Sequence, residues 1–145
     1  MDNEKEDLVI SNDKSLLHLD TVFAFLSRSY WANKRSEERI RKSIENSICY
    51  GVYLNNRQIG FARVVTDGAT MYYLCDVFID EAYRGQSIGK KLIESIIKSE
   101  ELKDLTGILG TKDAHGLYKQ YDFELDQEKM MRRMPDFIRN MNRLG

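Results

Sequence analysis

The sequence predicts a single mixed α/β domain. We expect a central, mixed, mostly antiparallel twisted sheet with helices on both faces and one parallel β–α–β unit. The chain has 145 residues, which suits one domain with a sizeable core. Its 42% hydrophobic and 31% charged residues are typical of a globular protein. A helical stripe of Ile88, Leu92 and Ile96 separates strand-like runs at 71–79 and 105–110, which predicts two parallel strands with a right-handed crossover.

The other elements follow from hydrophobic period and turn residues. Before the β–α–β unit we expect a strand at 8–10, a helix over 16–26, a second helix beginning after an N-cap at Ser36, and a hairpin of 49–54 and 58–66. After it we expect a short helix over 113–121 and a last hairpin of 123–125 and 129–134. The domain core is therefore predicted to run from about residue 8 to 134.

The tail, 135–145, carries apolar residues at helical spacing. Phe137, Ile138, Met141 and Leu144 predict a short amphipathic helix. Such a helix packs either on its own domain or on a second copy of the chain, so a homodimer is one open expectation.

Composition narrows the function classes. A net charge of −1 gives no general attraction to nucleic acid or to anionic membranes. No apolar run approaches the ~20 residues of a membrane span, and the acidic N-terminus is unlike a secretory signal, so we expect a cytoplasmic protein. Cys49 and Cys75 lie in apolar strand-like runs and predict buried thiols rather than a disulfide. Neither His18 nor His115 has a set of companion ligands, so we expect no metal.

A basic, glycine-punctuated turn at 84–90 connects the apolar strand 71–79 to the helix that follows it. Such a turn directs unpaired backbone N–H groups at one point, with the positive end of the helix dipole behind them. Open sheets bind ligands at the carboxyl ends of parallel strands, and the segment 111–118 follows the neighbouring strand at this same end. The turn is therefore a predicted anion site.

Two motifs resemble the GNAT superfamily of N-acetyltransferases. The family's acyl-CoA pyrophosphate loop, Arg/Gln-x-x-Gly-x-Gly/Ala, is similar to Arg84-Gly85-Gln86-Ser87-Ile88-Gly89-Lys90. Its later helix motif, ending Leu-Tyr-x-x-x-Gly-Phe, is similar to Asp113-Ala114-His115-Gly116-Leu117-Tyr118-Lys119-Gln120-Tyr121-Asp122-Phe123. The order of elements agrees from about Leu8 to Met134. Ser87 and Asp122 stand where the family usually has glycine. The serine places a side chain near the pyrophosphate, whereas aspartate tolerates a left-handed conformation.

The resemblance implies an acetyl-CoA-dependent N-acetyltransferase, without a metal, that transfers the acetyl group to a primary amine of a small molecule or protein. The amine would attack directly in a ternary complex. Tyr118 matches the tyrosine that many members place beside the sulfur as general acid. The implied acetyl-CoA contacts are Val77, Phe78, Ile79, Arg84, Gly85, Gln86, Ser87, Ile88, Gly89, Lys90, Thr111 and Tyr118.

The general base and the acceptor site stay open. Many members carry a carboxylate near the position of Met71, which this sequence lacks, and Asp76 is a candidate base or a structural hydrogen-bonding residue. Asp67 with a chain of water is a further candidate. Tyr30 and Trp31 have the composition of a pocket lip, although Trp31 could instead fill the core. Arg63 would recognise a carboxylate-bearing substrate if it points into the cleft, and would be solvated otherwise.

Two other classes remain. A catalytically silent acyl-CoA-binding regulatory or interaction module fits the missing strand carboxylate and Ser87. A nucleotide-phosphate-binding domain is disfavoured, because the glycines fit neither GxxxxGK[ST] nor GxGxxG. The sequence gives no sign of a nucleic-acid or membrane partner and does not identify the amine acceptor.

Overall fold

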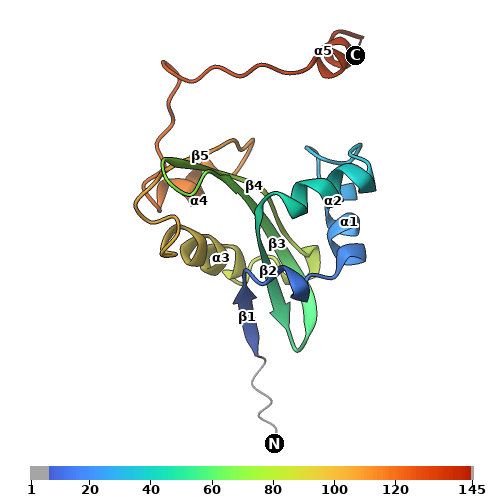
Figure 1. The fold of residues 1–145 in the computed structure, drawn as a ribbon, viewed down its shortest axis with the longest axis vertical. Coiled ribbons are helices and arrows are strands. Elements are labelled where there is room, and N and C mark those ends of the chain that lie inside the picture. The colour runs from blue at the N-terminus through green and yellow to red at the C-terminus, as the bar shows by residue number, and fades with distance from the viewer. Residues whose placement is uncertain (1–6, 145) are drawn as a thin grey trace, which may run out of the picture.

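The computed structural model describes residues 7–144. Within them lies one five-stranded sheet in the order β1-β2-β3-β4-β5 (Figure 1). Its strands are β1 (Leu8–Ser11), β2 (Ile48–Leu54), β3 (Arg57–Thr66), β4 (Met71–Ile79) and β5 (Thr106–Leu109). Neighbouring strands are antiparallel from β1 to β4, and β4 and β5 are parallel. The predicted fold class and the parallel unit are confirmed.

Helices cover both faces of the sheet. Two of them, α1 (Leu19–Ser27) and α2 (Glu37–Glu45), lie on one side, while α3 (Ile88–Ile97) and α4 (His115–Lys119) lie on the other (Figure 1). On the first side Phe61 and Phe78 of the sheet pack with the helices, and on the second side the buried stripe of α3 packs on Val64 and Leu74. No helix among the described residues is long and apolar enough to cross a bilayer.

Local side chains explain where several elements begin and turn. Ser36 Oγ accepts a hydrogen bond from the N–H of Arg39 at 3.1 Å, which confirms Ser36 as the N-cap of α2. Asn55 and Asn56 both have positive φ, 51° and 69°, as a two-residue type I′ hairpin turn requires. Asp67 closes the turn between β3 and β4 by accepting N–H bonds from the two residues before β4, at 2.9 and 2.8 Å.

A bulge interrupts the pairing of β3 with β4. Phe61 pairs with Phe78, but Arg63 pairs with Cys75, so two residues of β4 oppose one of β3. Asp76 lies at this point with φ 53°. Pairing of β4 with β5 ends at Leu74 and Leu109, so the last five residues of β4 continue beyond β5. The end of β4 is therefore open on its β5 side.

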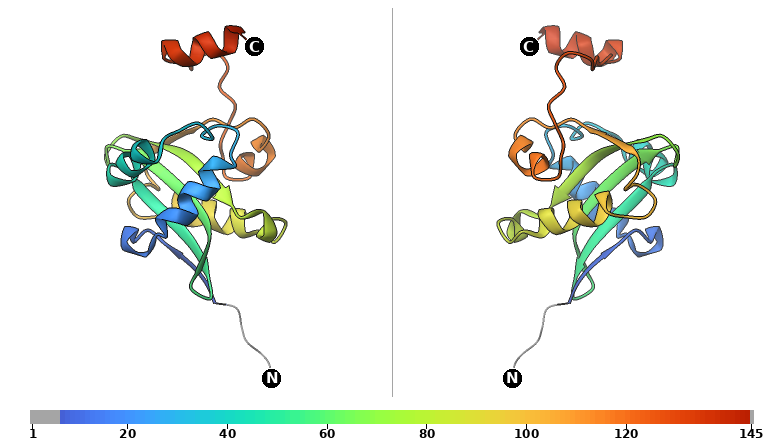
Figure 2. Two further views of the ribbon diagram at one scale, coloured as in Figure 1. Left: turned by 90° about the vertical axis from the view of Figure 1, so that its right-hand side faces the viewer. Right: turned by 90° about the vertical axis from the view of Figure 1, so that its left-hand side faces the viewer.

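The predicted last hairpin is wrong. The described residues 120–135 hold no strand, and the chain leaves the domain as an extended segment toward α5 (Asp136–Leu144) (Figure 2). Leu125 is 60% exposed and Met131 96% exposed, so neither is buried against the sheet as the inward face of a paired strand would be. The tail helix itself is confirmed. It stands apart from its own domain, and its contact with a second copy stays a prediction.

Candidate active site

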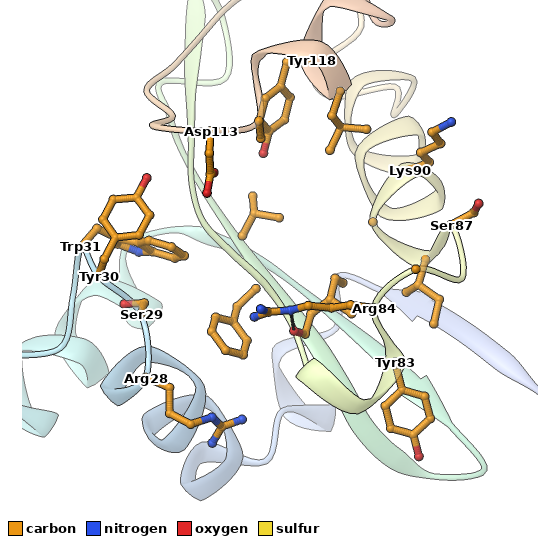
Figure 3. A pocket seen from close by; sticks show the side chains of 18 residues that line it. Arg28, Ser29, Tyr30, Trp31, Tyr83, Arg84, Ser87, Lys90, Asp113 and Tyr118 are labelled. Atoms are coloured by element: carbon orange, nitrogen blue, oxygen red, sulfur yellow. Dashed lines mark hydrogen bonds between the residues drawn. The ribbon is translucent and has the colours of Figure 1, made fainter.

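A cavity of about 500 Å³ lies where the open end of β4 meets the helices (Figure 3). Four segments form its walls: the residues after α1, the end of β4, the turn leading into α3, and the start of α4. The lining residues are Arg28, Ser29, Tyr30, Trp31, Val77, Phe78, Ile79, Tyr83, Arg84, Gly85, Ser87, Ile88, Gly89, Lys90, Asp113, Ala114, Leu117 and Tyr118. The two segments that resembled family motifs thus face one space.

The turn into α3 presents free backbone donors. Gly85 and Ser87 both have positive φ, 83° and 64°, and Ser87 is the residue before the helix, with no side-chain capping bond. Within the described chain, no N–H from Gly85 to Lys90 donates to another backbone carbonyl. The first turn of a helix leaves these groups unpaired unless a ligand or water accepts from them. The geometry fits an anionic ligand.

Arginine and lysine side chains surround this turn. Arg84 Nε donates to the carbonyl of Ile79 at 2.9 Å, and its guanidinium lies 4.9 Å from the centre of the Phe78 ring. Arg28, after α1, forms a bidentate pair with Glu81, with both N–O distances at 2.9 Å. Lys90 lines the same end of the cavity. Arg84 and Lys90 therefore add positive charge where the N–H groups converge.

The edge of β4 offers backbone groups between this turn and α4. The N–H of Asp80 donates to the carbonyl of Ile59 on β3 at 2.8 Å. Because successive residues of a strand direct their N–H and C=O groups to opposite sides, the groups of Ile79 face away from β3. Arg84 reaches the Ile79 carbonyl from that side. An extended ligand could pair with this edge of β4, as expected for Val77 and Ile79.

Tyr118 points its hydroxyl into the cavity from α4 (Figure 3). The side chain is 8% exposed and packs edge-on against Phe123, with ring centres 5.9 Å apart. Burial, and to a smaller degree Tyr30, raises the pKa of Tyr118 to about 12. The phenol is therefore protonated at neutral pH. Asp122, one turn further, has φ 67°, so the expected left-handed position is confirmed.

Asp76 does not face the cavity but is held by three side chains. Trp31 Nε1 donates to Oδ1 at 2.9 Å, while Arg35 Nη1 and Arg63 Nε donate to Oδ2 at 2.9 and 2.8 Å. Burial alone would raise the pKa of Asp76, but the two guanidinium groups outweigh it and hold that pKa below its usual value. A general base must bind a proton, which this setting opposes. The base role of Asp76 stays a prediction, and the geometry weighs against it.

Arg63 neither points into the cavity nor lies in solvent, which were the two orientations that the sequence left open. It does not line the cavity, and with 14% of its side chain exposed it is not solvated. Its second bond goes from Nη1 to Ser47 Oγ at 3.2 Å. A substrate role for Arg63 thus finds no support in the structure.

Tyr30 and Trp31 form an aromatic wall on the side of the cavity that lies across from the turn into α3 (Figure 3). Their rings lie edge to face with centres 5.0 Å apart, and Tyr30 Oη accepts a hydrogen bond from the N–H of Lys112 at 3.1 Å. Trp31 is 39% exposed, so it does not fill the core. The structure therefore agrees with the expectation that both residues lie at the lip of the pocket.

Two predicted contacts lie outside the cavity lining. Gln86 is exposed on the turn, and Thr111 Oγ1 accepts the N–H of Ala114 at 3.1 Å just before α4. The carboxylate of Asp67 stabilises the turn between β3 and β4, where hydrogen bonds from Thr70 and Ala69 lower its pKa. These positions support a structural function for Thr111 and Asp67.

Sequence reasoning missed three residues near the site: Arg28, Arg35 and Asp113. Among the described residues that line the cavity, Asp113 is the only carboxylate, and Figure 3 shows it directed into the cavity between the aromatic wall and Tyr118. Asp113 belongs to the helix motif, so its nearness to Tyr118 could have indicated its location. Nothing local indicates Arg35, whose partner Asp76 is 41 residues away.

The two cysteines are free and lie outside the cavity lining. Burial raises the pKa of Cys49 to about 11 and that of Cys75 to about 12. Both thiols therefore stay protonated at neutral pH, which disfavours either of them as a nucleophile.

These features define an α/β domain with an anion cradle and a tyrosine at the two ends of one cavity. Comparison with models of protein families identifies the family to which this domain belongs. Residues 45–125 match the family model described as "Acetyltransferase (GNAT) domain", and the chain belongs to that family.

Related proteins agree with this assignment. A solved structure from Xanthomonas campestris pv. campestris, described as belonging to the GNAT family, is 34% identical with a TM-score of 0.84, over 89% of this chain and 94% of that chain. An acetyltransferase-family protein of Gibberella zeae is 28% identical over 108 residues, which span 61% of each chain. A Clostridium acetobutylicum structure solved with acetyl-CoA is 11% identical, with a TM-score of 0.65 over 89% and 96% of the two chains, and shares the fold.

Proposed function

We propose that this protein transfers the acetyl group of acetyl-CoA to a primary amine of a small molecule or protein, by direct attack in a ternary complex. The observation that carries the proposal is the arrangement of one cavity. Unpaired N–H groups and cations lie at one end, Tyr118 lies at the other, and the open edge of β4 runs between them.

The residues at the cation-rich end suit a diphosphate. The N–H groups from Gly85 to Lys90 would bind its oxygens, and the side chains of Arg84 and Lys90 would balance its charge. The pantetheine arm would pair with Val77 and Ile79 on β4. Acetyl-CoA supplies the activated acyl group, and the thioester then comes to lie near Tyr118.

Tyr118 is the proposed general acid. As the amine nitrogen forms its bond to the acyl carbon, the C–S bond breaks and the sulfur takes the proton of the Tyr118 hydroxyl. The nitrogen then releases its surplus proton to water to become the amide, and the Tyr118 oxygen regains a proton from water. The raised pKa of Tyr118 keeps the hydroxyl protonated at neutral pH, so a proton is available as negative charge develops on the sulfur, although the same shift makes the phenol a weaker acid than an unperturbed tyrosine. An N–H of β4 would stabilise the negative charge on the carbonyl oxygen.

The acceptor amine is proposed to enter beside Tyr30, Trp31 and Asp113. Cations gather at the turn, whereas Asp113 is the only carboxylate among the described lining residues. Lys112 Nζ already lies 5.4 Å from the centre of the Tyr30 ring, so the carboxylate of Asp113 and the ring of Trp31 are the groups that would attract a cationic amine. Asp113 would hold the ammonium form, which loses its proton to water before it attacks.

A panel of binding and activity assays tests the proposal. Thermal melting with acetyl-CoA, CoA, ATP and NAD should show stabilisation by the first two only. Release of free thiol from acetyl-CoA across a panel of amines should then identify acceptors. No stabilisation by acetyl-CoA at millimolar concentration would refute the proposal.

The second candidate is a catalytically silent acyl-CoA-binding module. The ion pairing of Asp76 favours it, because that carboxylate is not free to act as a base. Stabilisation by CoA without thiol release for any amine would support this candidate. An Asp113→Asn variant with a raised acceptor KM and unchanged CoA stabilisation would support the enzyme.

A further inference from the structure

Asp76 occupies a place in the fold that links the two sides of the cavity. We infer that Asp76 is a positioning residue that sets the affinity for the acceptor by holding the aromatic wall against the bulge of β4. The inference rests on the proposed acetyl transfer and names the wall that receives the amine.

Three donors from two segments converge on this one carboxylate. Trp31 and Arg35 come from the loop between α1 and α2, and Arg63 comes from β3. Both carboxylate oxygens accept, and the side chain of Asp76 is 1% exposed. The loop is thus tied to the sheet through Asp76 by two charge-assisted bonds at 2.9 Å.

The bonds to Asp76 extend to groups that line the cavity. Trp31 lines it directly, and its ring lies edge to face with Tyr30. On the other side, Val77 follows Asp76 in the chain and lines the cavity on the open edge of β4. A displacement of the Asp76 carboxylate would therefore move the aromatic wall relative to β4.

The cradle for the diphosphate shares no hydrogen bond with this cluster among the described residues. Gly85 to Lys90 lie on the turn into α3, and neither Arg35 nor Arg63 lines the cavity. The inference therefore predicts a separation of effects. Weakening the cluster should impair acceptor use much more than acetyl-CoA use.

Two variants test the cluster, one at a donor of a hydrogen bond and one at the carboxylate that accepts all three. Trp31→Phe removes the N–H that reaches Oδ1 and keeps an aromatic ring at a partly exposed position, so it should fold. Asp76→Asn removes the charge that both arginines use and keeps a side-chain oxygen. Ile40→Val is the matched control, because Ile40 is a buried residue of α2 on the same face and its apolar side chain forms none of the hydrogen bonds to Asp76.

Steady-state kinetics with an acceptor from the panel give the first readout. In Trp31→Phe and Asp76→Asn the acceptor KM should rise about tenfold or more, because small misplacements of a wall are costly, while the acetyl-CoA KM stays within about twofold. The control should change neither. A parallel rise of both KM values, or no rise in acceptor KM, would overturn the inference.

A second readout needs no acceptor. Trp31 is the only tryptophan of the chain, so its fluorescence reports the wall alone. In Asp76→Asn, acrylamide should quench Trp31 more strongly than in the parent, with the same melting shift from CoA. Unchanged quenching would overturn the inference, whereas failure of the parent to bind CoA would refute the proposed function instead.

Discussion

Gly89 and Ile79 face each other at the cavity, with space for one methyl group between them. A Cβ built on Gly89 would lie 3.9 Å from Ile79 Cγ1, and no other contact would be closer. Gly89 is the second residue of α3, beside the unpaired N–H groups. The protein itself therefore does not require glycine here, but a ligand that approaches the helix backbone would.

Gly89→Ala should separate folding from ligand binding. Alanine favours a helix over glycine, so the free energy of unfolding should stay equal or rise by up to about 1 kcal/mol. The added methyl group should occupy space needed by the diphosphate and weaken CoA binding about tenfold or more. Calorimetric titration with CoA and urea unfolding measure the two effects.

Gly116→Ala is the control for this substitution. Gly116 lies in α4, has open space around its Cβ position and does not line the cavity. It should give a similar gain in stability with unchanged CoA affinity. Equal CoA affinity in Gly89→Ala and the parent would mean that the diphosphate binds elsewhere.

Ser87→Gly should relieve backbone strain at the turn. Ser87 adopts φ 64° and ψ 17°, a left-handed conformation that costs a non-glycine residue roughly 1–2 kcal/mol, partly offset by the greater unfolded-state freedom of glycine. We expect a net gain of up to about 1 kcal/mol in unfolding free energy, with CoA affinity equal to or above that of the parent. Ser87→Ala keeps the strain and removes the hydroxyl, which separates the two contributions. A clear loss of CoA affinity in Ser87→Gly would show that the serine itself binds the ligand.

Tyr118→Phe should lower kcat about 100-fold, the usual scale for loss of a general acid, and leave the CoA melting shift unchanged. Tyr121→Phe is the matched control, because Tyr121 lies on the same segment but does not line the cavity. Its hydroxyl instead donates to the Lys90 carbonyl at 3.3 Å. Single-turnover acetylation measures the chemical step directly. Unchanged turnover in Tyr118→Phe would remove the phenol from the mechanism.

Local signals explain the elements that the sequence located well. The bounds of β4 match the expected strand at 71–79 because a turn at Asp67 and Gly68 precedes it and a polar segment follows it. Ser36 and the glycine-containing turn before α3 are likewise short-range signals. The location of the turn proposed to bind the diphosphate could therefore be predicted from sequence.

Long-range pairing explains what the sequence could not locate. The bulge at Asp76 depends on the register of β3 against β4, and the bonds of Asp76 come from residues 41, 45 and 13 positions away. The missing last hairpin is a similar case. Its short segment at 123–125 could form a strand only with a partner strand, and the described segment that follows supplies none.

Acid should weaken the fold through Asp76. Burial opposes ionisation, but Arg63 and Arg35 hold the folded-state pKa of Asp76 below the unfolded value of ~3.9. A depressed pKa contributes stability that is fully present above the unfolded-state pKa and is lost as the pH falls through the folded-state pKa. Urea unfolding from pH 7 to pH 2.5 should therefore show the parent losing its advantage over Asp76→Asn as the solution is acidified. The same difference between parent and variant across this whole range would mean that the folded-state pKa of Asp76 is not lowered, and that the two arginines do not stabilise its charged form.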